Sequence, residues 1–127
     1  DLVTRKLGYG NGAVLKALLA DVAAGAADAP ALAQLAQSCA AIADWMVSDA
    51  SLDDRLAGSV PFCTMCSVAV AGWQLLRQAG SASDPAKAVV ARYFVDHLVP
   101  EALGLEAASR GGAGLLYALS AEQLAGA

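Results

Sequence analysis

Three cysteines and one histidine are the residues of this chain whose types could hold a metal ion or carry thiol chemistry. Cys63 and Cys66 form a CxxC pair, with Cys39 and His97 as conceivable third and fourth ligands of a zinc ion. Structural zinc ligands usually lie on knuckles and loops, whereas this pair lies in a long apolar stretch. A thioredoxin-type CxxC would follow a strand of a βαβ unit, which the pattern lacks. We therefore expect no metal site and interpret the cysteines as small buried hydrophobic residues.

The remaining candidates for chemistry also have simpler interpretations. His97 is the only histidine, so no His-pair metal site can be assembled from this chain, and we assign the side chain a structural role. Arg92 and Asp96, four residues apart, have the spacing of a surface ion pair on a helix. The sequence offers no set of residues for catalysis.

Two short motifs could suggest a phosphate or calcium site. The stretch from Gly111 to Gly114 is rich in glycine, but no strand precedes it and no Lys-Ser/Thr follows, so we interpret it as a helix terminator. Asp53 and Asp54 are adjacent carboxylates without a third ligand or a glycine turn, which makes a calcium site improbable. We therefore expect no catalytic, cofactor-binding or metal-binding residue in this chain.

These residues must be positioned by helices, because apolar side chains recur every three or four residues. The spacing predicts an antiparallel bundle of four main helices, over residues 12–24, 30–48, 59–79 and 85–110. The third helix is apolar nearly all round, so we expect it to be the most buried, with Trp73 at the centre of the bundle. Pro100 should kink the fourth helix. Ser120 and Gln123 stand at capping-box spacing in short C-terminal helical turns.

The starts of three of these helices are marked by a polar cap that precedes a proline in the first turn. The pairs are Asp28 with Pro30, Ser59 with Pro61, and Asp84 with Pro85. Residues 49–58 carry turn formers and charge, which indicates a loop with room for a single helical turn. We interpret residues 1–11 as a linker or the tail of a preceding domain, and residues 12–127 as one helical bundle domain.

The composition agrees with an all-α fold class and restricts the partners. The chain has 127 residues, of which 57% are hydrophobic and 6% aromatic, and much of the hydrophobic share is alanine. A net charge of -4 with eight scattered Lys and Arg leaves no basic stripe for nucleic acid. Three cysteines cannot all pair within one chain and no signal peptide is visible, so we expect a cytoplasmic location. The chain begins with Asp1 and looks like a piece of a longer protein.

One uncharged stretch is long enough to be a membrane-spanning helix. The 21 residues between Arg55 and Arg77 carry no charge, which is the length that a membrane-spanning helix needs. Several glycines, serines and other polar residues interrupt the stretch, and it lacks an aromatic belt or a flanking basic cluster. We expect this segment to be buried in a soluble bundle, with no membrane partner.

Three segments carry a resemblance to a known family. They are DLVTRKL at 1–7, VAVAGWQLLRQA at 68–79, and ARYFVDHLVPEA at 91–102 with the closing ALSAEQL. The specific part is a Gly-Trp on the third expected helix, followed after a loop by Arg-Tyr-Phe, Asp-His-Leu and Pro-Glu. Together they resemble the additional C-terminal domain of one branch of the acyl-CoA dehydrogenase superfamily, the large bacterial enzymes similar to 3-methylthiopropanoyl-CoA dehydrogenase. The resemblance spans nearly the whole chain.

The resemblance implies a function for a parent protein and little chemistry for this chain. Such enzymes oxidise an acyl-CoA thioester to the enoyl-CoA, passing a hydride to FAD while a glutamate removes the α-proton. Their catalytic glutamate and most contacts to FAD and CoA lie in the domains before this one, so no such residue is transferred here. The family tends to have bulky residues where this chain has Cys63 and Cys66, which favours the packing interpretation of the cysteines over the metal one.

Two functions follow as alternatives. The favoured one is an accessory C-terminal domain, non-catalytic in isolation, of a flavoprotein acyl-CoA dehydrogenase of fatty acid metabolism. FAD is then the cofactor of the parent enzyme, and the preceding domains are the partners of this chain, with a homo-oligomer as a further expectation. The alternative is a free-standing helical interaction module without enzymatic activity. An acyl-CoA dehydrogenase pattern in the reading frame upstream of Asp1 would distinguish the two.

Overall fold

The computed structural model describes residues 1–126, and every regular element in that range is helical. The main helices are α1 (Ala13–Gly25), α2 (Pro30–Ser48), α4 (Ser59–Ser81) and α5 (Ala86–Leu103). The short ones are α3 (Leu52–Ala57), α6 (Glu106–Arg110) and α7 (Ala121–Ala125), with irregular helical turns η1 (Leu2–Lys6), η2 (Tyr9–Gly12) and η3 (Gly114–Tyr117). The predicted all-α fold class with four main helices is confirmed.

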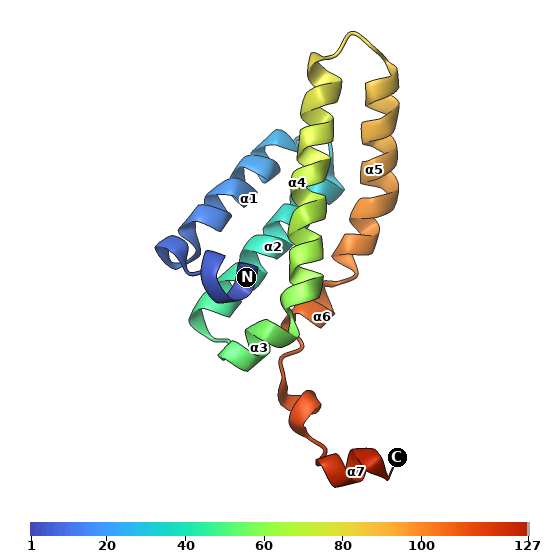
Figure 1. Cartoon of the computed structure of the whole chain (residues 1–127). Helices are drawn as coiled ribbons and strands as arrows, with labels where there is room; N and C mark the ends of the chain where they lie inside the picture. Colours follow the sequence, from blue (N-terminus) through green and yellow to red (C-terminus); the bar gives the residue numbers. More distant parts are fainter. Residues whose placement is uncertain (127) are drawn as a thin grey trace.

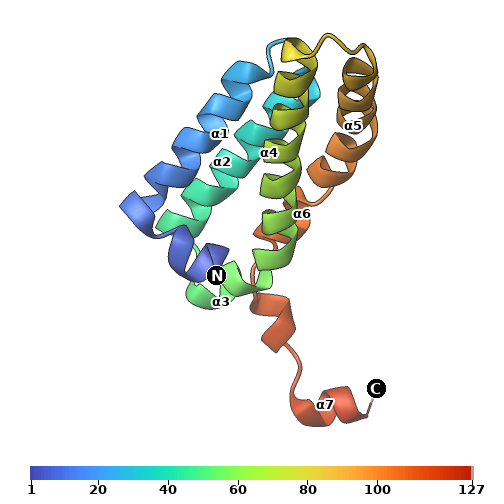
Figure 2. The ribbon, with the colours of Figure 1, turned by 45° about the horizontal axis from the view of Figure 1, so that its top comes forward.

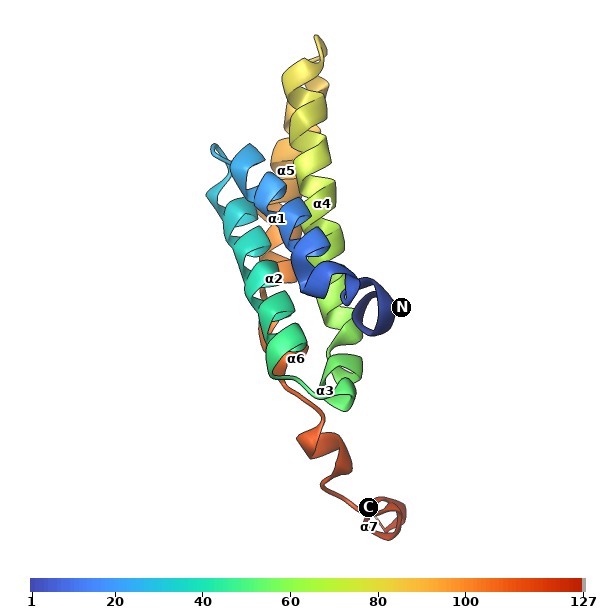
Figure 3. The ribbon, with the colours of Figure 1, turned by 90° about the vertical axis from the view of Figure 1, so that its left-hand side faces the viewer.

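The four main helices form two antiparallel hairpins that pack on each other (Figure 1). α1 and α2 make one hairpin, and α4 and α5 make the other. α2 also packs against α4, α5 and α6, so it lies between α1 and the α4–α5 hairpin, as the rotated view shows (Figure 2). The α4–α5 hairpin extends beyond the end of the α1–α2 hairpin (Figures 1 and 3).

The most buried helix is α2, and the expectation that the helix around Trp73 would be the most buried is wrong. The buried side chains of α2 follow its whole length: Leu32, Leu35, Ala36, Cys39, Ile42, Ala43 and Met46. α4 is longer but buries only Phe62, Met65, Cys66, Ala69 and Gly72. The reason is the position of the helix. Although α4 is apolar nearly all round, other helices cover only one side of it and the opposite face is open.

Trp73 lies at the edge of the bundle, so the prediction of a central tryptophan is also wrong. Its side chain is partly buried, and the guanidinium carbon of Arg77 lies 5.1 Å from the centre of its ring. On its inner side the indole lies against Gly25, where a Cβ would come within 2.5 Å of Nε1. The buried residue of the Gly-Trp pair is Gly72, whose missing side chain makes room for Leu32.

The predicted helix starts are confirmed in part. Asp84 accepts a hydrogen bond from the N–H of Ala86 at 2.9 Å, as a cap with a following proline requires. Asp28 makes no such bond, and α2 starts after Ala29 without a side-chain cap. Ser59 is not a cap either, because its hydroxyl donates to the Leu56 carbonyl at 2.8 Å and the residue lies inside α4. α3 and α4 are separated by one residue, which leaves no loop for a cap to occupy.

The fourth predicted helix is two elements instead of one. Helical structure continues through Pro100 and ends at Leu103, and α6 begins separately at Glu106. The N–H of Leu105 bonds to the carbonyl of Ala102 at 3.0 Å, a spacing of three residues that tightens and ends the helix. The interruption therefore falls at Gly104, four residues after the proline.

The C-terminal end of the described chain contains the helix terminator and the capping box that the sequence predicts. Gly112 has a φ of +70 and ends α6, and the capping box is present, with the Ser120 hydroxyl accepting from the N–H of Gln123. At the other end Val3 and Leu7 are buried in the core of the bundle. The domain boundary at residue 12 stays a prediction.

α4 is also the one described helix that is long and apolar enough to cross a membrane by length and composition. Only 28% of its most apolar window is buried, although the helix packs against α1, α2, α5 and α6. A core helix of a soluble bundle meets the same criterion, and that assignment remains our prediction.

Candidate functional site

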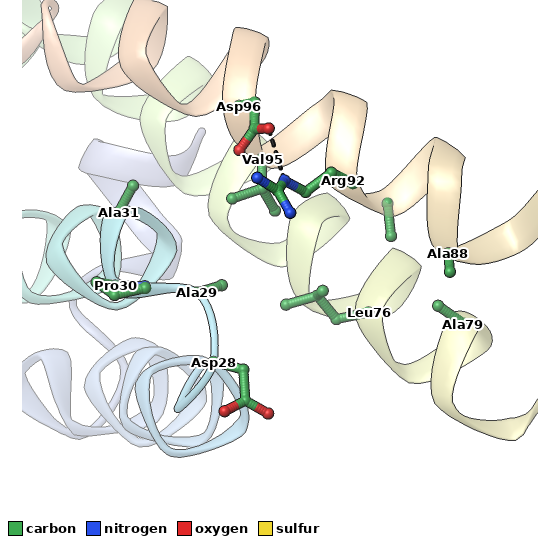
Figure 4. Close-up of a pocket in the computed structure, with 11 residues that line it drawn as sticks. Asp28, Ala29, Pro30, Ala31, Leu76, Ala79, Ala88, Arg92, Val95 and Asp96 are labelled. Carbon is green, nitrogen blue, oxygen red and sulfur yellow. Dashed lines mark hydrogen bonds and ion pairs between the residues drawn. The ribbon is translucent and has the colours of Figure 1, made fainter.

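The candidate site is a hollow of about 430 Å³ between the α1–α2 connection and the α4–α5 hairpin (Figure 4). The α1–α2 connection and the start of α2 supply one wall, through residues 28–31. The α4–α5 hairpin supplies the other: Leu76, Ala79, Ala88, Ala91, Arg92, Val95 and Asp96. Alanines on both walls leave space that larger side chains would fill, which is why a hollow forms here.

The charges at this hollow are few and mostly paired with each other. Arg92 Nε and Asp96 Oδ2 are 2.7 Å apart, which confirms the predicted ion pair. The hydrogen bond to Asp96 raises the pKa of Arg92, so the guanidinium is charged at any working pH. Asp28 lies on the opposite wall (Figure 4). Because the wall contains no histidine, cysteine or hydroxyl side chain, it provides neither a nucleophile nor a base that titrates near neutral pH.

Of the three cysteines and the histidine, only Cys39 and Cys66 are brought together. Cys39 and Cys66 are buried and share a hydrogen bond across α2 and α4, whereas Cys63 is exposed, contrary to the expectation of burial. His97 lies on the outer face of α5, with its ring centre 4.5 Å from that of Tyr93. Within residues 1–126 no group of three or more His, Cys, Asp or Glu side chains is placed to hold a metal. The absence of zinc stays a prediction.

The thiol of Cys66 is chemically inert in this environment. The hydrogen bond with Cys39 raises the pKa of Cys66 strongly, and burial raises it further. A thiol that remains protonated is neither a nucleophile nor a metal ligand. The packing interpretation therefore fits Cys39 and Cys66, and Cys63 is left as the accessible thiol of the three.

Asp54 has a structural role that the sequence analysis missed. It forms a capping box with Ser51 at the start of α3, and its Oδ1 accepts a hydrogen bond from the N–H of Ala113 at 2.8 Å. The bond from Ala113 lowers the pKa of Asp54, and the bonds from Ser51 lower it further. The Ser-x-x-Asp spacing signalled the cap, but the 59-residue separation from Ala113 left no local signal for the second bond.

Three apolar surfaces are exposed on the described chain, and we define each by its residues. The α5 face consists of Val89, Val90, Tyr93 and His97, of which Val89 is 69% and Tyr93 62% exposed. The α1–α4 groove, of about 460 Å³, is lined by Leu2, Leu15, Leu18, Cys63, Cys66, Ser67, Val70 and Ala71. The C-terminal arm is residues 114–126, which project from the end of the bundle (Figures 1 to 3). Surfaces of this kind on a soluble domain commonly mark interaction sites.

Comparison with known proteins identifies one family. A family model described as "Acetyl-CoA dehydrogenase C-terminal like" matches residues 13–120. The matched range begins at the first residue of α1 and ends at the residue that caps α7, so it includes both hairpins. No curated protein and no solved structure matches. The chain belongs to the family of acetyl-CoA dehydrogenase C-terminal-like domains.

Proposed function

We propose that this chain is a non-catalytic accessory domain of an FAD-dependent acyl-CoA dehydrogenase, of the branch similar to 3-methylthiopropanoyl-CoA dehydrogenase. In this role it docks on the preceding domains of the parent enzyme and supports its architecture or assembly. The family match over residues 13–120 is the observation that carries the proposal. The partner class and the absence of catalysis rest on the arguments that follow.

The α5 face supports docking. Val89, Val90 and Tyr93 are each more than half exposed and lie within little more than one turn of one helix. Large apolar side chains gathered in this way are unfavourable in water and become favourable when another protein covers them. The ring of His97 lies against that of Tyr93, which gives the face a continuous aromatic part. This face is our candidate for the contact with the preceding domains.

The described acidic residues support the non-catalytic part of the proposal. Dehydrogenation of an acyl-CoA needs a carboxylate held against the α-carbon, with its pKa raised by burial toward neutral. Glu101 and Glu122 are exposed, and Glu106 is paired with Arg110 at 3.4 Å. The pKa of Asp54 is lowered by its hydrogen bonds from Ala113 and Ser51, which is the opposite of what a base requires.

The proposal is tested with the purified 127-residue chain. Mixed with FAD, an acyl-CoA and an artificial electron acceptor, it should keep no flavin after gel filtration and reduce no acceptor. Retained visible flavin absorbance, or acceptor reduction that depends on acyl-CoA, would contradict a non-catalytic accessory role. Reading the coding sequence upstream of Asp1 then tests the parent: an acyl-CoA dehydrogenase pattern supports the proposal, and an immediate start codon favours the free-standing module.

A further inference from the structure

The C-terminal arm is the most exposed apolar part of the molecule. Its five large apolar side chains are Leu115 at 90%, Leu116 at 66%, Tyr117 at 71%, Leu119 at 51% and Leu124 at 59% exposed. Ala, Gly, Ser and Gln make up most of the remainder, and Glu122 is the one charged side chain among residues 114–126. Such a composition is typical of a segment that packs against protein.

The arm cannot hold its shape alone. η3 has four residues and α7 has five, whereas isolated helices shorter than about 12–15 residues are marginal in water. The capping box of Ser120 and Gln123 satisfies the first turn of α7 but adds only about 1 kcal/mol. Neither element packs closely on the main helices. A helical arm of this kind needs an external surface.

The α1–α4 groove provides an apolar surface of matching character. Apart from Ser67, its lining consists of apolar side chains and cysteines, and the exposed Val60 extends it along α4 through an adjoining hollow. The groove lies between η1, α1 and α4. The arm of the same chain leaves the bundle beside α3 and α6 and points away from the main helices (Figures 1 and 3). The arm therefore leaves its own groove open.

The charges beside the groove complement the arm. Lys6 and Arg5 lie on η1, next to the groove residue Leu2, and Arg5 is paired with Asp1 at 2.7 Å. Lys6 adds a positive charge at this border in a chain whose net charge is -4. The arm brings a single carboxylate, on Glu122. A contact between Glu122 and the basic residues of η1 would be attractive, whereas the net charges of two such acidic chains repel each other.

We propose that the C-terminal arm of one copy of this chain docks in the α1–α4 groove of a second copy, and that the exchange is reciprocal. A reciprocal contact is the two-fold arrangement that closes on itself without forming fibres. Five large side chains from each copy, at on the order of 100 Å² each, contribute about 1,000 Å², and the two grooves add a smaller area. The total comes to the lower end of the roughly 1,200–2,000 Å² of a stable interface. This inference is independent of the parent enzyme.

Sedimentation of the purified chain over a range of concentrations is the first test. The native chain should form a dimer, and the double variant Leu115→Asp with Leu116→Asp should weaken dimerisation at least tenfold in Kd. Leu18→Asp in the groove should do the same, whereas Val89→Asp on the α5 face should leave the dimer unchanged. Circular dichroism checks that each variant keeps its helices. A native chain that is monomeric up to several hundred micromolar, or a dimer indifferent to both changes, would overturn the proposal.

Cysteine cross-linking between two distinguishable copies locates the contact. One copy carries Leu116→Cys together with Cys63→Ser, and the other, longer by a tag, keeps its native Cys63, which is exposed in the groove. Mild oxidation should produce a covalent mixed dimer, which is lost when the second copy also carries Cys63→Ser. The matched control places the new cysteine at Val89. An intramolecular disulfide in a single chain that has both Leu116→Cys and Cys63 would show instead that the arm fills its own groove.

Discussion

At the scale of single residues, two glycines fix how closely the helices approach. Gly58 stands between α3 and α4, and a Cβ there would collide with the backbone carbonyl of Ser109. Ser109 is itself fully buried, with its hydroxyl donating to the Leu105 carbonyl at 2.9 Å. The Ser109 carbonyl cannot move aside cheaply, because it is part of the backbone of α6 and the Ser109 side chain is packed under α4. At Gly72, where α4 meets α2, a Cβ would come within 2.9 Å of a methyl group of the Leu32 side chain.

We predict that Gly58→Ala destabilises the fold by about 1–3 kcal/mol, since the added methyl group must displace the backbone of α6. The matched control is Gly80→Ala, because a Cβ at Gly80 meets nothing within 4 Å. The control should be neutral or stabilise the protein by about 0.4–1 kcal/mol. Urea titration of both variants measures the difference, and equal midpoints would disprove the close contact at Ser109.

The cysteines lead to a second prediction at this scale. The purified chain should carry no stoichiometric zinc, because no three of its described His, Cys, Asp and Glu side chains are placed to hold a metal. Replacing Cys63 by Ala should change the stability little, since the side chain is exposed, and replacing Cys66 should cost about 1 kcal/mol for lost packing. One zinc per chain in elemental analysis, removed by a chelator with loss of helicity, would contradict this interpretation.

At the scale of elements, the hydrogen bond from Ala113 to Asp54 determines where the C-terminal arm leaves the bundle. It joins the start of α3 to the turn after α6, two elements that are far apart in sequence. Gly112, with its positive φ, lets the backbone reach the carboxylate, since a Cβ there would come within 3.0 Å of Asp54 Oδ1. The start of the arm is therefore anchored although the arm itself is not packed.

Acid should release this anchor. The folded-state pKa of Asp54 lies below its ordinary value of 3.8, so its stabilisation is complete above that value and disappears as the pH falls through the lower folded value. The amide of Ala113 should lose its protection from hydrogen exchange over the same range. Asp54→Ala should remove the protection at neutral pH, while Asp53→Ala should not. An Ala113 amide that stays protected in Asp54→Ala would show that the bond is dispensable.

Most of the elements, but few of the contacts between them, could be predicted from the sequence. Apolar spacing and the proline signatures located all four main helices, because both are local patterns. The depth of burial could not be derived in this way: α4 is apolar nearly all round, and only the way in which α2 packs on the α4–α5 hairpin leaves Trp73 at the edge. The bond from Ala113 to Asp54 and the α1–α4 groove likewise join residues from distant segments.

At the scale of the whole molecule, the family match connects this bundle with a larger enzyme, and the α5 face is the proposed contact. We predict that Tyr93→Glu leaves the isolated bundle folded, because the side chain is 62% exposed, and lowers the thermal stability of the parent enzyme. Leu56→Glu on α3, 47% exposed and away from the α5 face, serves as the control. Scanning calorimetry of both parent variants measures the effect. Equal unfolding temperatures would exclude the α5 face as the docking surface.

The two-hairpin arrangement also has a consequence for how the chain folds. A short connection joins α1 to α2, and another joins α4 to α5. Each hairpin therefore forms through contacts between residues that are close along the chain. Proteins dominated by such local contacts fold in microseconds to milliseconds. We expect the hairpins to form early and their mutual docking, through α2 and Gly72, to be the rate-limiting step. The close approach of Leu32 to Gly72 is then among the last contacts that the chain makes.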